Sequence, residues 1–429
     1  MECYQNPPRD SWRGLCRRAM TEQQPRVIET VAGIIDNVRN RGDEALLEYE
    51  LKFTGAELSS LAVTEAEIAE GIAGVSDELK SAIKIAIDNI SKFHSAQVME
   101  PIEVVTTPGV RCRQCQMPID RVGLYIPGGN SPLFSTVLML AIPAKIAGCE
   151  RIVLCTPAGA DGRVNPAILY AASAVGVTEI YKTGGAQAIA AMTFGTETIP
   201  AVYKIFGPGN RYVMEAKQQV TRYGVAIDMP AGPSEVMVIA DDKAPIEFIA
   251  ADFLSQAEHG PDSQSILLTD SATVAAALPA EIERQMSSLP KQELIARSLE
   301  HSRVIMFGDR SEMMDFANEY APEHLIIACE DWDALSRKVR NAGSVFLGYF
   351  TPESAGDYAS GTNHTLPTSS YAYSYSGVNL DSFCKKITFQ HITPEGARSL
   401  GPAVEAMAEA EGLMAHRNAM ALRVNFNND

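Results

Sequence analysis

From Arg121 onward, short apolar runs alternate with glycine-rich turns and alanine-rich segments, and this alternation limits the possible folds more than any other feature of the chain. The apolar runs at 122–126, 151–155, 179–182 and 203–206 have the length of buried strands, and the segments between them have the length of helices. Parallel strands need such crossover helices to bring the chain back to the same end of a sheet. The pattern therefore predicts parallel βαβ units.

A second series of the same kind runs from 235 to 347. The sequence therefore predicts an α/β protein with two tandem Rossmann-like domains, both incomplete because the G-x-G-x-x-G fingerprint is absent. A Gly/Ser/Thr/Tyr/Asn-rich segment at 351–381 is too long for a simple connector and is typical of functional loops. The expected domains are an N-terminal arm (1–22), a first α/β domain with a helical N-terminal part (23–121 and 235–375), a second α/β domain with the glycine turns (122–234) and a C-terminal helical extension (376–429).

Charge and apolar content exclude several classes of protein. With 36 basic and 53 acidic residues the net charge is -17, which repels nucleic-acid phosphates and anionic lipid, so neither partner is expected. No apolar run reaches the roughly 18 residues of a membrane span, and the first twelve residues lack the apolar stretch of a secretory signal. We therefore expect a cytoplasmic protein with reduced thiols; the pair Cys112 and Cys115 has no second pair with which to form a zinc ribbon.

Three glycine turns, at 127–130, 184–187 and 207–210, each lie between an expected strand and an expected helix. In an open α/β sheet such turns bring helix N-termini to the carboxyl ends of the strands, where phosphate-bearing ligands bind. Tight βα turns also require glycine for backbone reasons alone. Both interpretations remain open from these turns.

Four of the seven histidines lie beside other potential ligands or acid/base groups: Gln256 with His259, Glu323 with His324, Asp357 with His364, and Glu411 with His416. By contrast, His94, at the end of an amphipathic helix, is expected in solvent, and His391, in an apolar–polar alternation, is expected to pack.

Three interpretations of the four pairs remain open. Each histidine could be a satisfied polar residue. The mixed nitrogen and oxygen donors could bind a metal, with zinc plausible and Mn, Co or Fe also compatible. Glu323 and His324 could act as an acid/base pair, provided that the backbone bends at Pro322, because consecutive strand residues point to opposite faces.

Eight motifs, in this order, resemble the histidinol dehydrogenase family over about 31–424. They are VGLYIPGG (122–129), GGAQAIAA (184–191), IFGPGN (205–210), AIDMPAGPSE (226–235), LSQAEHGPDSQ (254–264), APEHL (321–325), ESAGDYASGTNH (353–364) and HRNA (416–419). The motifs are long and in register, so the resemblance is specific.

The resemblance implies a role for each matching position. It implies that Glu323 and His324 are the catalytic acid/base pair. The implied zinc ligands are Gln256, His259, Asp357 and His416; the implied substrate contacts are these four with Ser234, His324, His364 and Glu411; and the implied NAD contacts are Tyr125, Gln187 and Asn210.

The family's reaction, as the resemblance implies it, is the oxidation of L-histidinol through L-histidinal to L-histidine with two NAD and one zinc per subunit. His324 would accept the hydroxyl proton, and Glu323 would activate the water that adds to the aldehyde. Zinc would anchor the substrate's imidazole and amine. The resemblance also implies a homodimer in which the C-terminal extension, with His416, reaches the active site of the other subunit.

Two other functions fit some of these residues. A zinc-dependent hydrolase would use Glu323 to activate a metal-bound water, but it leaves the glycine turns unexplained. A two-domain amino-acid-binding protein would leave the acid/base pair unexplained. Formation of NADH separates the dehydrogenase from both.

Overall fold

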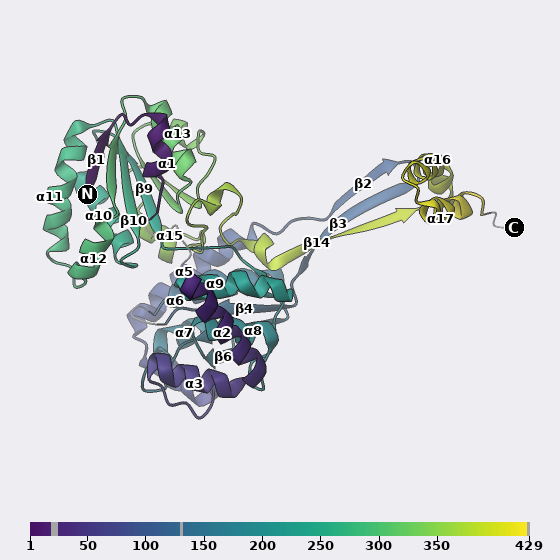
Figure 1. The fold of residues 1–429 in the computed structure, drawn as a ribbon, viewed down its shortest axis with the longest axis horizontal. Coiled ribbons are helices and arrows are strands. Elements are labelled where there is room, and N and C mark those ends of the chain that lie inside the picture. Colours follow the sequence, from purple (N-terminus) through teal and green to yellow (C-terminus); the bar gives the residue numbers. More distant parts are fainter. Residues whose placement is uncertain (19–24, 129–131, 427–429) are drawn as a thin grey trace. The chain divides into compact units, whose positions relative to one another are not determined.

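Two structural units make up the chain. The computed structural model describes residues 1–18, 25–128 and 132–426. The larger unit comprises Met1–Gln97 and Ile119–Phe383, and the smaller comprises Val98–Pro118 and Cys384–Asp429. The larger unit contains two parallel sheets with their helices, and the smaller contains an antiparallel sheet with two helices (Figure 1).

The first parallel sheet has the strand order β6-β5-β4-β7-β8 and is formed by the part of the chain that contains the three glycine turns. In β4 the buried side chains alternate between two core clusters, with Val122 and Leu124 in one and Tyr125 in the other, because helices cover both faces. The strands are β4 (Arg121–Tyr125), β5 (Arg151–Thr156), β6 (Glu179–Lys182), β7 (Lys204–Phe206) and β8 (Ala226–Ile227). The helices are α2 (Pro25–Arg41), α3 (Asp43–Thr54), α8 (Gly185–Phe194) and α9 (Arg211–Val220) in one cluster, and α4 (Glu65–Gly74), α5 (Asp77–Ser95), α6 (Phe134–Ala147) and α7 (Pro166–Ala174) in the other.

The second parallel sheet has the order β1-β11-β10-β9-β12-β13. Its strands are β1 (Glu2–Gln5), β9 (Glu235–Ala240), β10 (Gln264–Thr269), β11 (Arg303–Met306), β12 (His324–Ala328) and β13 (Ser344–Leu347). One core cluster takes in α10 (Ile246–Ala257), α11 (Ala272–Met286) and α12 (Gln292–Leu299), and the other takes in α1 (Arg9–Leu15), α13 (Arg310–Tyr320) and α14 (Trp332–Ser336). After β13 come α15 (Glu353–Tyr358) and the short 3-10 helices η2 (Tyr371–Tyr373) and η3 (Leu380–Phe383); η1 (Thr221–Tyr223) follows α9.

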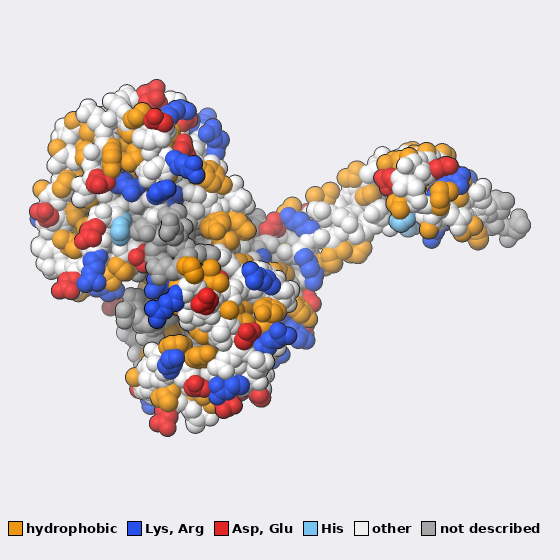
Figure 2. Space-filling view, viewed as in Figure 1, with side chains coloured by type: hydrophobic (Ala, Val, Ile, Leu, Met, Phe, Trp, Pro, Cys, Tyr) orange, Lys and Arg blue, Asp and Glu red, His pale blue; other side chains and the backbone are white. Residues whose placement is uncertain are grey.

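The smaller unit is an antiparallel sheet of order β14-β3-β2 followed by two packed helices. Its elements are β2 (Ile102–Thr107), β3 (Val110–Pro118), β14 (Cys384–Ile392), α16 (Pro394–Ala410) and α17 (Met414–Val424). Large apolar side chains of this sheet are exposed, and hydrophobic side chains are visible along it in Figure 2. The exposed set is Ile102, Val104, Val105, Ile387, Phe389 and Ile392.

The predicted α/β class with parallel sheets is confirmed, but the packing of the N-terminal segments differs from the expected domains. The expected grouping joined residues 23–121 to 235–375, whereas α2, α3 and α5 pack with the first sheet. Residues 2–5 are an edge strand of the second sheet rather than a separate arm. An amphipathic stripe requires an apolar surface but does not specify which sheet provides it.

Three local expectations also need correction. His94 is fully buried and its Nδ1 contacts the carbonyl oxygen of Ile90, whereas His391 on β14 is exposed. The C-terminal extension contains β14 as well as helices. Gly129 and Asn130 of the first glycine turn lie outside the described residues. Among the described helices, none is long and apolar enough to cross a membrane.

Candidate active site

His324 and Glu323 converge at the amino ends of two neighbouring strands. His324 begins β12 and pairs with Val236 of β9, and Glu323 directly precedes it. Ala321 has a left-handed backbone with φ of 53°, and Pro322 follows, so the chain bends before the strand. The bend brings both side chains together, with Glu323 Oε2 3.6 Å from His324 Nδ1.

The peptide groups of Glu235, the first residue of β9, contact both members of the pair. Its N–H donates to Glu323 Oε2 at 2.9 Å, and its carbonyl oxygen lies 3.2 Å from His324 Nδ1. Two further carboxylates face the imidazole: Glu353 Oε1 is 4.0 Å from Nδ1, and Asp357 Oδ1 is 3.7 Å from Nε2. Among the described residues, Nε2 has no hydrogen-bond partner.

Burial and charge shift the pKa values of this group. Burial raises the pKa of Glu323 to about 8. Burial opposes the charge of His324, but the carboxylates of Glu353, Glu323 and Asp357 outweigh it and raise the pKa of the imidazole well above its ordinary value. Burial also raises the pKa of Glu353. Burial opposes the charge of Asp357 too, but His324 and the other histidines lower its pKa. In the metal-free protein, burial therefore favours the neutral form of Glu323, and the surrounding carboxylates favour the charged form of His324.

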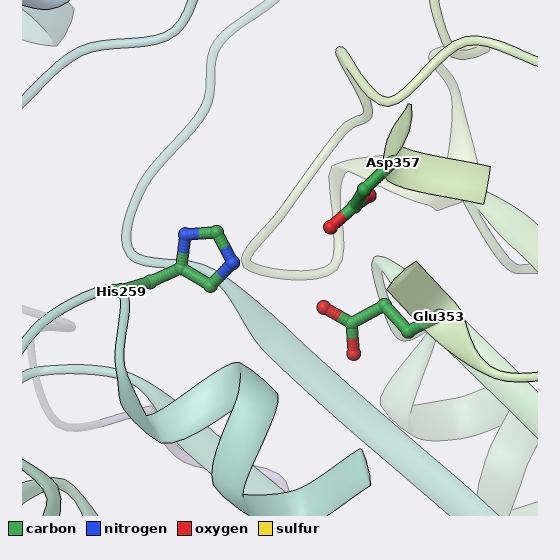
Figure 3. Close-up of side chains that lie close together, drawn as sticks. All are labelled: His259, Glu353 and Asp357. Carbon is green, nitrogen blue, oxygen red and sulfur yellow. The ribbon is translucent and has the colours of Figure 1, made fainter. Parts of the chain in front are cut away.

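Beside this pair, His259, Glu353 and Asp357 form a cluster that could hold a metal ion. One ligand atom from each lies within 4.8 Å of the others. Figure 3 shows the imidazole facing the two carboxylates. Glu353 and Asp357 are four residues apart on α15, so both project from one face of the helix. His259 follows the end of α10.

Gln256 lies one turn before His259 on α10 and is fully buried. Among the described residues, neither atom of its amide has a hydrogen-bond partner, and neither does either carboxylate oxygen of Glu353. Buried polar atoms are normally bonded, so a group of unbonded acceptors beside a histidine is typical of a ligand site. Imidazole, carboxylate and amide oxygen donors fit zinc.

Ser234 and His364 lie next to these elements. Ser234 directly precedes β9, and its carbonyl oxygen accepts a bond from the Gln264 N–H. His364 Nδ1 lies 2.8 Å from the carbonyl oxygen of Asp357, and its Nε2 lies 3.0 Å from Thr136 Oγ1 on α6. His364 is thereby held beside the cluster.

Glu411 and His416 belong to the smaller unit. Glu411 caps the C-terminus of α16, His416 lies on α17, and both side chains are exposed. The larger unit's cluster consists of residues from α10, α15 and the segments that follow them.

The expected cofactor residues lie at the carboxyl ends of strands in the first sheet. The hydroxyl oxygen of Tyr125, at the end of β4, accepts a bond from the N–H of Gly185 at 3.2 Å. Gln187 Nε2 donates to Glu50 at 3.1 Å. Asn210 begins α9, and its side-chain oxygen caps the helix. Strand order reverses between β4 and β7, which is where ligands bind in open α/β sheets.

Comparisons with known proteins agree with this arrangement. The family model described as histidinol dehydrogenase matches residues 16–424. A histidinol dehydrogenase of Bacteroides thetaiotaomicron is 55% identical over 425 residues, which cover 99% of each chain. One of Salmonella typhimurium is 52% identical over 96% of this chain and 95% of its own. The crystal structure of histidinol dehydrogenase from Elizabethkingia anophelis has a TM-score of 0.96 at 52% identity and covers 99% of this chain and 98% of its own.

The chain belongs to the histidinol dehydrogenase family. It is therefore an oxidoreductase of the last two steps of histidine biosynthesis. Two residues of these sites were not predicted from the sequence: Glu353, which belongs to the possible metal cluster, and Glu50, which accepts bonds from the glycine turn at 184–187. Glu353 opens the same motif as Asp357, four residues earlier, and that spacing could have identified it. Glu50 lies on an amphipathic helix more than a hundred residues before its partners and carried no such signal.

Proposed function

We propose that this chain oxidises L-histidinol through L-histidinal to L-histidine with two NAD and one zinc ion per subunit. The observation that carries the proposal is a buried acid/base pair beside a group of unbonded metal-ligand atoms. The glycine turns at the carboxyl ends of the first sheet support a dinucleotide. A hydrolase would not need them.

Gln256, His259 and Asp357 would hold the zinc, with His416 as a fourth ligand. The unbonded amide of Gln256 and the facing groups of His259 and Asp357 support this set. When bound, zinc supplies an anchor for the imidazole and amine of histidinol. Glu353 lies close enough to be a further ligand or to balance the charge.

His324 is the proposed base in both oxidations, and its protonation is controlled by the ligands. Glu353 and Asp357 hold the proton on His324, so their engagement with a cation would lower the pKa of the imidazole toward neutrality. His324 would then accept the hydroxyl proton of histidinol while a hydride leaves the same carbon. The products of this step are histidinal, NADH and a proton.

Glu323 is the proposed base for the water that adds to histidinal. Its Oε2 is held by the Glu235 N–H, which leaves the other carboxylate oxygen to accept a proton. Ionised Glu323 would take a proton from water as the water oxygen adds to the carbonyl carbon, and would pass it to the carbonyl oxygen, which gives the diol. After releasing its first proton to solvent, His324 would accept a hydroxyl proton of the diol while the second hydride leaves the same carbon. This step yields histidine and a second NADH, so the four-electron balance closes.

Tyr125, Gln187 and Asn210 are the proposed NAD contacts. Tyr125 and Asn210 flank the point at which the strand order of the first sheet reverses, and Gln187 lies on α8 after β6. Asn210 lies at a helix N-terminus, which favours phosphate. When bound, NAD accepts the hydride in each oxidation. Ser234, His364 and Glu411 are proposed substrate contacts. Each of the two sheets would correspond to an incomplete Rossmann-like domain, as all of their strands are parallel.

A homodimer with shared active sites is the proposed assembly, in the cytoplasm. The exposed apolar side chains of the smaller unit support burial against a second copy of the chain. We expect mixtures of His416→Ala and His259→Ala proteins to regain activity, because one site in a mixed dimer would be intact. Absence of recovery at any mixing ratio would contradict sharing.

The deciding experiment is the NADH yield per L-histidinol, before chelation, after it, and after zinc is restored. Two NADH, lost with the chelator and regained with zinc, is the expected result. Glu323→Gln is the matched variant: it keeps the side-chain shape but lacks the second base, so it should stop near one NADH and release aldehyde to a carbonyl reagent. No NADH from the parent protein would favour a hydrolase or a binding protein instead.

A further inference from the structure

Arg18, in the N-terminal segment, has its guanidinium group buried at the amino end of β9, an interior strand of the second sheet. Its side chain is 8% exposed. Nε and Nη2 donate to the two carboxylate oxygens of Glu235 at 2.7 and 2.9 Å. Nη2 also donates to the carbonyl oxygen of Tyr320 at 2.7 Å, and Nη1 donates to Ser370 Oγ at 2.8 Å. The guanidinium carbon lies 3.5 Å from the centre of the Tyr320 ring.

Glu235 connects this arginine to the acid/base pair. Its carboxylate, 1% exposed, also accepts a bond from the N–H of Ser369 at 3.1 Å. Its own N–H and carbonyl oxygen contact Glu323 and His324 at 2.9 and 3.2 Å. One residue therefore bonds to Arg18 through its side chain and to both catalytic groups through its backbone.

Arg18 also fixes the turn from which the pair emerges. Tyr320 ends α13, and only Ala321 and Pro322 separate it from Glu323. The guanidinium bonds to the Tyr320 carbonyl, so it ties the start of β9 to the last residue before the bend. A planar fork with five donors can make these bonds at once, whereas an ammonium group cannot reproduce that geometry.

The bonds of Arg18 are not needed merely to attach the N-terminal segment. β1 pairs along its full length with β11, and Trp12 is buried among Phe307 and Phe316. Arg303 of β11 also donates to the carbonyl oxygen of Leu15. A buried charge pair makes a poor anchor, because desolvation offsets much of its attraction.

We propose that Arg18 is a positioning residue, which holds the Glu235 peptide groups in the register that aligns Glu323 and His324. This inference rests on the proposed function, because it assigns those two residues to proton transfer. A displacement of about 1 Å in a catalytic group can lower the rate about a hundredfold. Loss of the fork therefore lowers kcat without removing a substrate or cofactor contact.

The test compares Arg18→Lys with Arg303→Lys in the full-length zinc-loaded enzyme. Both variants replace a guanidinium fork by an ammonium group near the same segment, but the described bonds of Arg303 go to the carbonyl oxygens of Leu15 and Arg17 and not to Glu235. We expect Arg18→Lys to lower kcat at least tenfold with the KM of L-histidinol and NAD within threefold of the parent, and Arg303→Lys to retain kcat. Equal losses in both variants, or parental kcat in a folded Arg18→Lys, would overturn the proposal.

Glu235→Gln keeps the proposal testable if Arg18→Lys does not fold. It retains the side-chain shape and the backbone, and Arg18 keeps its bonds to Tyr320 and Ser370, so the fold should persist while kcat falls at least tenfold. Unchanged kcat in this variant would contradict the positioning role.

A measurement without turnover separates this inference from the proposed function. The imidazole nitrogen resonances of His324, assigned with His324→Asn in nitrogen-15 spectra of the metal-free protein, report its bond to the Glu235 carbonyl. We expect these shifts to move in Arg18→Lys and to stay in Arg303→Lys. If the parent forms no NADH, the proposed function fails. The His324 shifts then decide the positioning role alone, and unchanged shifts in Arg18→Lys would refute it.

Discussion

Replacing Gln256 by methionine should stabilise the metal-free protein and weaken zinc binding at the same time. Gln256 is fully buried, and its amide oxygen and nitrogen have no hydrogen-bond partner in the described part of the chain. Methionine has a similar length, fills the same space and brings no donor or acceptor that needs one.

The size of both effects follows from this environment. An unpaired buried amide costs roughly 1–3 kcal/mol in protein mutational data, and Gln256→Met removes that cost. For a unit as large as Met1–Gln97 with Ile119–Phe383, an unfolding entropy of about 2.1 cal/mol/K per residue converts this gain to a rise of about 1–4 °C in the Tm of the metal-free protein. Even the partners of metal ligands contribute on the order of 10- to 100-fold to metal affinity, so loss of a ligand should weaken zinc binding by about 100-fold or more.

Gln264 provides the matched control. It is also buried, but its Nε2 donates to the carbonyl oxygen of His301 at 2.8 Å, and its Oε1 accepts a bond from the Tyr320 hydroxyl at 2.7 Å. Gln264→Met therefore removes both of these bonds from buried partners, and it should lower the Tm. Zinc affinity should stay at the parental value.

The assay is calorimetry in chelator for the Tm, followed by competition with a chromophoric chelator for zinc affinity. Opposite Tm shifts in the two variants, with weakened zinc binding only in Gln256→Met, are the expected result. A fall in the Tm of metal-free Gln256→Met together with parental zinc affinity would refute the reasoning, because the amide would then be bonded in the protein and not a metal ligand.

Three further predictions concern Asp252, Glu50 and Gly207. Burial raises the pKa of Asp252 to about 7, so the protonated carboxyl stabilises the fold fully at pH values below its unfolded pKa, and this contribution is lost as the pH rises through 7. In chelator, the stability of Asp252→Asn relative to the parent should therefore improve between pH 4 and 8, by at most about 4 kcal/mol. A stability difference that stays constant across these pH values would contradict the shift. Through one oxygen, Glu50 accepts bonds from Thr183, Gly184 and Gln187, in and just before the glycine turn at 184–187. Glu50→Met should therefore raise the KM for NAD about tenfold or more, while Glu50→Gln, which keeps one acceptor, should stay close to the parent. Equal KM values in steady-state kinetics would argue against a role in the turn. A Cβ on Gly207 would lie 2.1 Å from the Tyr125 carbonyl oxygen, whereas a Cβ on Gly224, which is also at positive φ, would meet nothing within 4 Å. Thermal denaturation should therefore show a large loss of Tm for Gly207→Ala and a small loss for Gly224→Ala. Similar losses in the two variants would mean that the contact between β4 and β7 relaxes freely.

The sequence predicts the parallel sheets because buried strands and crossover helices leave distinct patterns, but it does not predict the smaller unit. The strand β14, with the sequence CKKITFQHI, is exposed along almost its whole length, and β2 likewise. The apolar–polar alternation around His391 is short, and its apolar side chains Ile387 and Phe389 are exposed, so the usual link between alternation and a buried face does not hold for this strand. The N-terminal segments were correctly predicted as helices, but they were assigned to the second sheet, whereas α2, α3 and α5 pack with the first. Their apolar stripes could pack against either sheet.

The candidate site divides in the same way. Motifs identify Gln256, His259 and the pair Glu323–His324, because their partners are near in sequence or because the motifs that contain them resemble those of a known family. Arg18 could not be identified, because the carboxylate that it binds is 217 residues away. A charged residue near the N-terminus is usually solvated, and only the folded chain shows that this one is buried.

Hydrogen bonding separates the residues that would bind ligands from those that hold them in place. Within the described residues, the buried side chains of Gln256, Glu353 and His324 each carry polar atoms without a hydrogen-bond partner. Such atoms destabilise the fold, and a bound metal or substrate can offset that cost. The carboxylate of Glu235 is as deeply buried, yet both its oxygens accept charge-assisted bonds from Arg18. A ligand gains little binding free energy from a polar group that already has its hydrogen bonds, but it gains much from a buried polar group that has none. The buried polar atoms without partners therefore indicate where a ligand would bind. Substitution of a ligand residue such as Gln256 should therefore change ligand affinity and protein stability in opposite directions. Substitution of a positioning residue such as Glu235 should change kcat alone.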